Sequence, residues 1–265
     1  MLNHERTGSG PAVVLVHGLA ADQEFFAPVV AGLARDHTVV SVDLPGHGGS
    51  PAGDAPTLAA AAAGLAEVLD GLGLQDVALL GWSLGATVTW TYLEQYGSGR
   101  VRALVSVEQT PWLLAEDGWP YAAFGTLDAE AAAGLLASAG SDPGAVAENL
   151  VRGSFAAGTT PDPAVVEPLV ERARRTSPAS LQGLLGDVLR EDWRPRVGGI
   201  DVPTLLVHGA RSQVYPPEVG TWLAKAFPRA RLELLEDSGH LCFLEQPERF
   251  CGTVRAFLAP ETTER

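Results

Sequence analysis

The strongest chemical signal in the sequence is a serine set between two glycines. Gly81-Trp82-Ser83-Leu84-Gly85 follows an aliphatic run and leads into a helix-compatible stretch, residues 86–95. A G-x-S-x-G segment between a strand and a helix forms a sharp turn that exposes the serine hydroxyl. The pattern predicts that Ser83 is a nucleophile, in preference to the alternative of a purely structural turn.

A serine hydroxyl is a weak nucleophile until a base takes its proton. His240 lies in the segment Asp237-Ser238-Gly239-His240, after the last predicted strand and downstream of the serine. We expect His240 to take the proton from Ser83 and return it to a leaving group, so the predicted chemistry is acyl transfer. His17 and His208, which each end a predicted strand, are expected to form local hydrogen bonds instead.

The elements that must position these residues are strands and helices in alternation. Strands are predicted in the runs rich in Val and Leu, at 12–17, 37–43, 76–81, 101–107, 203–208 and 231–235. Nearly continuous aliphatic runs are typical of parallel strands buried on both faces. The predicted fold class is α/β, a mostly parallel central sheet flanked by helices, with functional groups at the carboxyl ends of the strands.

The strand pattern stops between residues 111 and 195, where the chain becomes rich in Ala and is broken by prolines at 143, 161, 163, 168 and 178. Because strand-like runs flank this stretch, we interpret it as a helical cap inserted into a single domain of residues 1–265. Candidates for lining an apolar substrate pocket are Trp82, Trp112, Trp119, Tyr121 and Phe124. The alternative is that these aromatic side chains pack against the sheet.

Composition narrows the classes of partner. The formal net charge of -14 disfavours nucleic acid and anionic membranes, and we expect a small-molecule substrate. The polar N-terminal residues and the absence of a spanning apolar run predict a cytoplasmic protein. Cys242 and Cys251 are too few for a disulfide scaffold and form no metal-binding motif, so neither a metal nor another cofactor is expected. The oligomeric state stays open.

Five landmarks in this order resemble the α/β-hydrolase superfamily, in its branch of small esterases, lactonases and cofactor-free haloperoxidase-like proteins. The resemblance covers nearly the whole chain and rests on His17-Gly18-Leu19, Asp43-Leu44-Pro45-Gly46-His47-Gly48-Gly49-Ser50, the segment around Ser83, His208-Gly209 and Gly239-His240. It implies an oxyanion hole formed by the backbone amides of Leu19 and Leu84, which stabilise the charge that develops during acyl transfer.

The sequence departs from this family at the acid that orients the histidine. In the family the acid most often lies three residues after the glycine that follows the strand corresponding to residues 203–208. In this chain the segment is Gly209-Ala210-Arg211-Ser212, which has a serine at that position. A serine cannot carry the required charge. Glu108, at the carboxyl end of the strand 101–107, is the predicted replacement, as in certain haloalkane dehalogenases. The alternative is an acid without a role at this position.

These observations predict a metal-free serine hydrolase that cleaves a carboxylic ester or lactone of a small, largely apolar substrate through an acyl-enzyme. The departure at Ser212 leaves two alternatives open. One is an enzyme of the same fold that performs acyl transfer, perhydrolysis, C–C bond cleavage or cyclisation. The other is a non-catalytic ligand-binding protein. Epoxide hydrolases and dehalogenases are disfavoured because they use an aspartate where this chain has Ser83.

Overall fold

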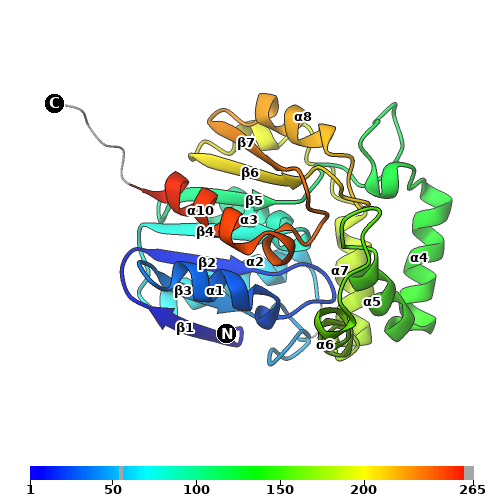
Figure 1. The fold of residues 1–265 in the computed structure, drawn as a ribbon, viewed down its shortest axis with the longest axis horizontal. Coiled ribbons are helices and arrows are strands. Elements are labelled where there is room, and N and C mark those ends of the chain that lie inside the picture. Colours follow the sequence, from blue (N-terminus) through cyan, green and yellow to red (C-terminus); the bar gives the residue numbers. More distant parts are fainter. Residues whose placement is uncertain (54–55, 260–265) are drawn as a thin grey trace.

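The computed structural model describes residues 1–53 and 56–259, and its centre is a seven-stranded sheet in the order β1-β3-β2-β4-β5-β6-β7 (Figure 1). The strands are β1 (His4–Gly8), β2 (Ala12–Val16), β3 (Thr38–Val42), β4 (Val77–Trp82), β5 (Val101–Val107), β6 (Thr204–Gly209) and β7 (Ala230–Leu235). The strands β2 to β7 run parallel to one another, and β1 pairs antiparallel with β3. The predicted fold class is confirmed.

The strand β1 was not predicted from the sequence. It lies at the edge of the sheet, and four of its five residues are exposed. A strand that pairs on one side and faces solvent needs no aliphatic run, so its sequence, His-Glu-Arg-Thr-Gly, lacks the signal that revealed the six buried strands.

Helices cover the sheet outside the cap. They are α1 (Ala27–Leu33), α2 (Leu58–Gly71), α3 (Leu84–Tyr96), α8 (Glu218–Ala226), α9 (Cys242–Glu245) and α10 (Pro247–Leu258). The helix α2 packs on α3, and α1 packs on α10 (Figure 1). The side chain of Thr57 caps α2 by accepting a hydrogen bond from the amide of Ala60 at 3.1 Å.

The chain between β5 and β6 forms the helices α4 (Ala129–Ser141), α5 (Pro143–Arg152), α6 (Pro163–Ala173) and α7 (Pro178–Val188), which lie beyond the carboxyl ends of the strands (Figure 1). Three prolines of this stretch, Pro143, Pro163 and Pro178, are the first residues of α5, α6 and α7, a position that proline favours. Pro168 instead lies inside α6, and apolar residues on both sides of it are buried. The assignment of residues 1–265 to a single domain stays a prediction.

The register of the sheet determines which residues meet at its carboxyl edge. Trp82 pairs with Val107 across β4 and β5, and Val107 pairs with Val207 across β5 and β6. The residues that follow these pairs, Ser83, Glu108 and His208, are therefore neighbours in space. Within the described part of the chain, no helix is long and apolar enough to cross a membrane.

Candidate active site

Ser83 occupies a strained turn between β4 and α3. Its φ of 54° and ψ of −124° lie in a region that residues with a side chain rarely adopt. The turn is possible because its glycines leave no side chain in the way: a Cβ on Gly85 would lie 2.1 Å from the carbonyl oxygen of Val16, and one on Gly81 would lie 2.4 Å from that of Gly85. The backbone thus holds the Ser83 side chain in the pocket beneath the cap.

Glu108 lies directly against His240, on a carboxylate that is fully buried. The Nδ1 atom of His240 is 2.7 Å from Glu108 Oε2. Glu108 also accepts hydrogen bonds at 2.7 Å from the amide of Gly209 and from the hydroxyl of Ser212. A carboxylate with three such donors is held in one orientation, so the structure places Glu108 where the sequence predicted an acid, with Ser212 as its partner.

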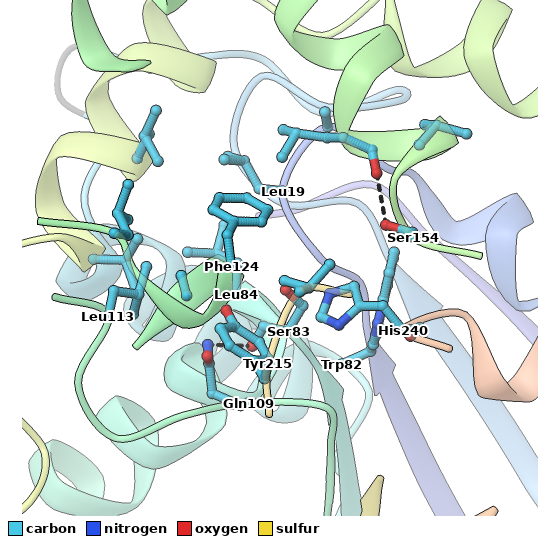
Figure 2. Close-up of a pocket in the computed structure, with 18 of the residues that line it drawn as sticks. Leu19, Trp82, Ser83, Leu84, Gln109, Leu113, Phe124, Ser154, Tyr215 and His240 are labelled. Atoms are coloured by element: carbon cyan, nitrogen blue, oxygen red, sulfur yellow. Dashed lines mark hydrogen bonds between the residues drawn. The ribbon is translucent and has the colours of Figure 1, made fainter. Parts of the chain in front are cut away.

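His240 is held from several sides. The indole nitrogen of Trp82 donates to the His240 carbonyl at 2.9 Å, and the amide of Gly239 donates to Glu245 at 2.7 Å. The imidazole ring lies 5.4 Å from the ring of Trp82 and 5.3 Å from that of Tyr215, between centroids. Figure 2 shows the side chains of His240 and Ser83 facing the same pocket, which both residues line.

Leu19 and Leu84 line the same pocket next to Ser83. Leu84 is the first residue of α3, where amides have no partner within the helix. Among the described residues, neither amide donates to a backbone carbonyl outside the regular elements. The role of these two amides as donors to an oxyanion stays a prediction from the family resemblance.

The chamber around Ser83 is small and apolar, with a volume of about 80 Å³. Trp82 and Phe124 line it, as predicted, while the structure places Trp112, Trp119 and Tyr121 outside its walls. The rest of the wall is aliphatic apart from Phe25 and five polar side chains, which belong to Ser83, Gln109, Ser154, Tyr215 and His240 (Figure 2). No lining side chain carries a fixed charge.

Trp112, Trp119 and Tyr121, which were predicted to line the pocket, belong to a separate cluster. Trp119 packs edge-on against Tyr121 and against Trp222 of α8, each with ring centroids 5.1 Å apart. The guanidinium of Arg194 lies over the rings of Trp112 and Trp119. These residues join the cap to α8 by aromatic and cation–π contacts. They pack against α8 and Arg194, and neither the predicted pocket nor the alternative of packing against the sheet describes them.

Among the polar residues that line the pocket, Gln109, Ser154 and Tyr215 escaped sequence reasoning. Gln109 donates to the Ser83 carbonyl at 2.9 Å and to Thr87 Oγ1 at 2.7 Å, which braces the turn. Burial raises the pKa of Tyr215, and a hydrogen bond with the Ser83 side chain opposes the rise. Gln109 could have been predicted from its place directly after Glu108, at the carboxyl end of β5, whereas Tyr215 lies in a loop without a motif.

Three further histidines, His17, His47 and His208, are buried near the site. His17 accepts from the amide of Leu44 at 3.0 Å and contacts the Gly18 carbonyl at 2.7 Å, as expected. Neither ring nitrogen of His208 has a hydrogen-bond partner among the described residues, contrary to expectation. Its Nδ1 is 3.6 Å from Glu108 Oε1. Burial lowers the pKa of His17 and His208, and that of His47 to about 3.

The comparison with known families agrees with this geometry. The family model described as alpha/beta hydrolase fold matches residues 11–247. The chain belongs to this family. The resemblance predicted from the five landmarks is therefore confirmed.

Curated relatives span nearly the whole chain. A pimeloyl-[acyl-carrier protein] methyl ester esterase of Chromobacterium violaceum is 33% identical over 250 residues, which cover 93% of both chains. The protein of the same name from Neisseria meningitidis serogroup B is 31% identical over 246 residues, covering 93% of this chain and 92% of its own. Among solved structures, an esterase from Exiguobacterium antarcticum superposes with a TM-score of 0.89 at 26% identity, covering 97% of this chain and 94% of that one.

Proposed function

We propose that the protein is a serine hydrolase that cleaves a carboxylic ester or lactone of a small apolar substrate through an acyl-enzyme. The observation that carries the proposal is the 2.7 Å contact between His240 Nδ1 and the buried Glu108 carboxylate, in a pocket that also holds Ser83. The relatives named esterases support ester hydrolysis as the reaction class.

The proposed mechanism follows from the hydrogen bonds of His240. With its Nδ1–H donated to Glu108, the imidazole presents Nε2 as the acceptor for the Ser83 proton. Ser83 Oγ attacks the carbonyl carbon, and the oxyanion accepts hydrogen bonds from the amides of Leu19 and Leu84. His240 then donates the proton to the leaving alcohol, and water cleaves the acyl-enzyme by the same path.

The lining of the chamber favours an uncharged acyl group, because no Asp, Glu, Lys or Arg side chain lines it. A carrier-linked ester, as in the names of the relatives, also needs a docking surface. The cap offers few cationic groups to any carrier that presents negative charge, because residues 111–195 hold twelve Asp and Glu against six Arg. All six arginines form intramolecular ion pairs, which involve Arg152, Arg172, Arg174, Arg175, Arg190 and Arg194. We therefore propose a free ester as the substrate.

Turnover and active-site labelling test the reaction together. We expect p-nitrophenyl acetate and butyrate to be hydrolysed by the wild type and not by Ser83→Ala, with a fluorophosphonate labelling Ser83 in the wild type alone. If Ser83 is labelled but no ester or lactone is hydrolysed, the proposed hydrolysis is wrong and another reaction of the same fold, such as acyl transfer, is favoured. Absence of both would contradict an enzymatic role.

The substrate class has its own test. The methyl ester of a free dicarboxylic acid monoamide and the same acyl group on acyl carrier protein are compared at equal concentration. A lower kcat/KM for the carrier-bound ester supports the free substrate, and a higher value contradicts it.

A further inference from the structure

Two hollows in the molecule share one wall. The chamber around Ser83 has a volume of about 80 Å³, and a second hollow of about 250 Å³ lies between the turn Ala123–Gly125, α4 and α5. The residues that line both are Phe124, Leu135, Leu150 and Val214. The second hollow is completed by Ser138, Val146, Asn149 and Gly153. The four shared side chains therefore form a partition between the chamber and an outer groove.

Phe124 is the least anchored part of this partition. Leu135 and Leu150 project from helices and pack against the core, whereas Phe124 is 48% exposed and is carried by a short turn. Its backbone has a φ of 54° and a ψ of 18°, the left-handed conformation that a residue with an aromatic side chain rarely adopts. The amide of Phe124 donates to the Val214 carbonyl at 2.7 Å, which ties the two wall segments together. Figure 2 shows the Phe124 ring projecting into the pocket.

The volumes indicate what this wall does. A cavity of roughly 150 Å³ holds one benzene molecule in another protein, and the chamber here is about 80 Å³. A short acyl group fits beside Ser83, and the groove across the partition offers further space for a longer chain. The outer groove has a volume of about 250 Å³ and walls that are mostly apolar.

We propose that Phe124 is the residue that determines chain length, by closing the chamber toward the outer groove. An ester chain longer than the chamber displaces the Phe124 ring and extends between α4 and α5. The inference rests on the proposed function, because it concerns the ester that reacts at Ser83. It adds a second binding region for that ester and names the side chain that controls access to it.

The experiment compares kcat/KM for p-nitrophenyl acetate and octanoate in variants on both sides of the wall. We expect Phe124→Ala to raise the octanoate-to-acetate ratio at least about tenfold, the effect of adding room for a methylene or more, and Phe124→Leu to give a smaller rise. Phe124→Tyr preserves the wall and should keep the wild-type ratio. Asn149→Trp fills the outer groove from an exposed position on α5 and should lower the ratio. Tyr96→Ala, which removes an exposed aromatic ring remote from both hollows, is the matched control.

The outcomes separate this inference from the proposed function. If the wild type hydrolyses acetate through Ser83 and Phe124→Ala changes the ratio by less than twofold while remaining folded by circular dichroism, the partition is wrong and the hydrolase stands. The same chain-length preference can be measured without turnover, as the ratio of the rates at which long-chain and short-chain alkyl fluorophosphonates label Ser83. A wild type that neither hydrolyses nor is labelled overturns both.

Discussion

Replacing Glu108 by Gln changes one buried oxygen to an amide nitrogen and removes a charge from the centre of the site. Three donors point at the Glu108 carboxylate, from Gly209, Ser212 and His240. If the glutamine oxygen faces Gly209, its NH₂ group faces His240 Nδ1, which must then be the unprotonated nitrogen. The proton moves to Nε2, and His240 can no longer accept the proton of Ser83. The reverse orientation sets the NH₂ group against the amide of Gly209.

The magnitude follows from these two orientations. The wrong tautomer costs about 10⁴ in kcat in a protease with the same arrangement. The reverse orientation leaves buried donors unpaired at a cost of about 1–3 kcal/mol each, so it is too unfavourable to restore the activity. We expect Glu108→Gln to lower kcat by about three to four orders of magnitude with KM nearly unchanged, since the apolar walls of the chamber are untouched.

The assay is p-nitrophenyl butyrate turnover, with folding checked by circular dichroism. Ser212→Ala removes one donor and leaves the charge, so its loss should stay below about tenfold. Glu108→Gln combined with Ser212→Asp should recover at least tenfold over the single variant, because Ser212 Oγ is 2.7 Å from the oxygen that contacts His240. Activity of Glu108→Gln within tenfold of the wild type would refute the assignment of the acid.

Three further predictions concern stability and the pocket. His47 has a folded pKa of about 3 against 6.5 for the free side chain, so the unfolded chain binds a proton that the folded one excludes. Stability therefore falls as the pH drops below about 6.5, and His47→Gln should lose about 2 kcal/mol less than the wild type between pH 7 and pH 5 in urea unfolding. Gly85→Ala should destabilise by about 2–3 kcal/mol, because its Cβ would meet Val16, whereas Gly252→Ala, in open space on α10, should be neutral or stabilising in the same measurement. Tyr215→Phe removes a hydroxyl from the pocket that Tyr215 shares with Ser83 and should lower kcat about fivefold at constant KM in steady-state kinetics; an increase would show that the phenol restrains the nucleophile.

The parts of the fold that the sequence revealed are those whose chemistry is local. Buried parallel strands need aliphatic runs, and a helix start needs a side-chain cap such as Thr57. Ser83 was found because its turn requires glycines at fixed positions, and the contacts of Gly81 and Gly85 give the physical reason. The edge strand β1 was missed because exposed residues leave it without a pattern.

The pocket walls could not be read in this way, because they depend on how distant segments pack. Trp112 and Trp119 are as aromatic as Phe124, yet Arg194 and α8 hold them in a different cluster. Tyr215 reaches Ser83 from a loop after β6, and nothing in its neighbours along the chain indicates that contact. Aromatic composition predicts that a pocket can exist, and only the packing of the cap decides which rings line it.

The proposed acid, Glu108, lies where two neighbouring strands end, and this position explains how a site of this kind can take its acid from either strand. The strands β5 and β6 are paired neighbours, with Val107 opposite Val207, so the residues beyond their carboxyl ends converge on the same space. Glu108 and Ser212 come from these two ends, and their side chains meet at 2.7 Å. A carboxylate from either strand can therefore reach His240, provided that the residue at the other end is small or donates a hydrogen bond. Two carboxylates there would repel each other in a buried site, which explains why a chain with Glu108 benefits from a serine at position 212.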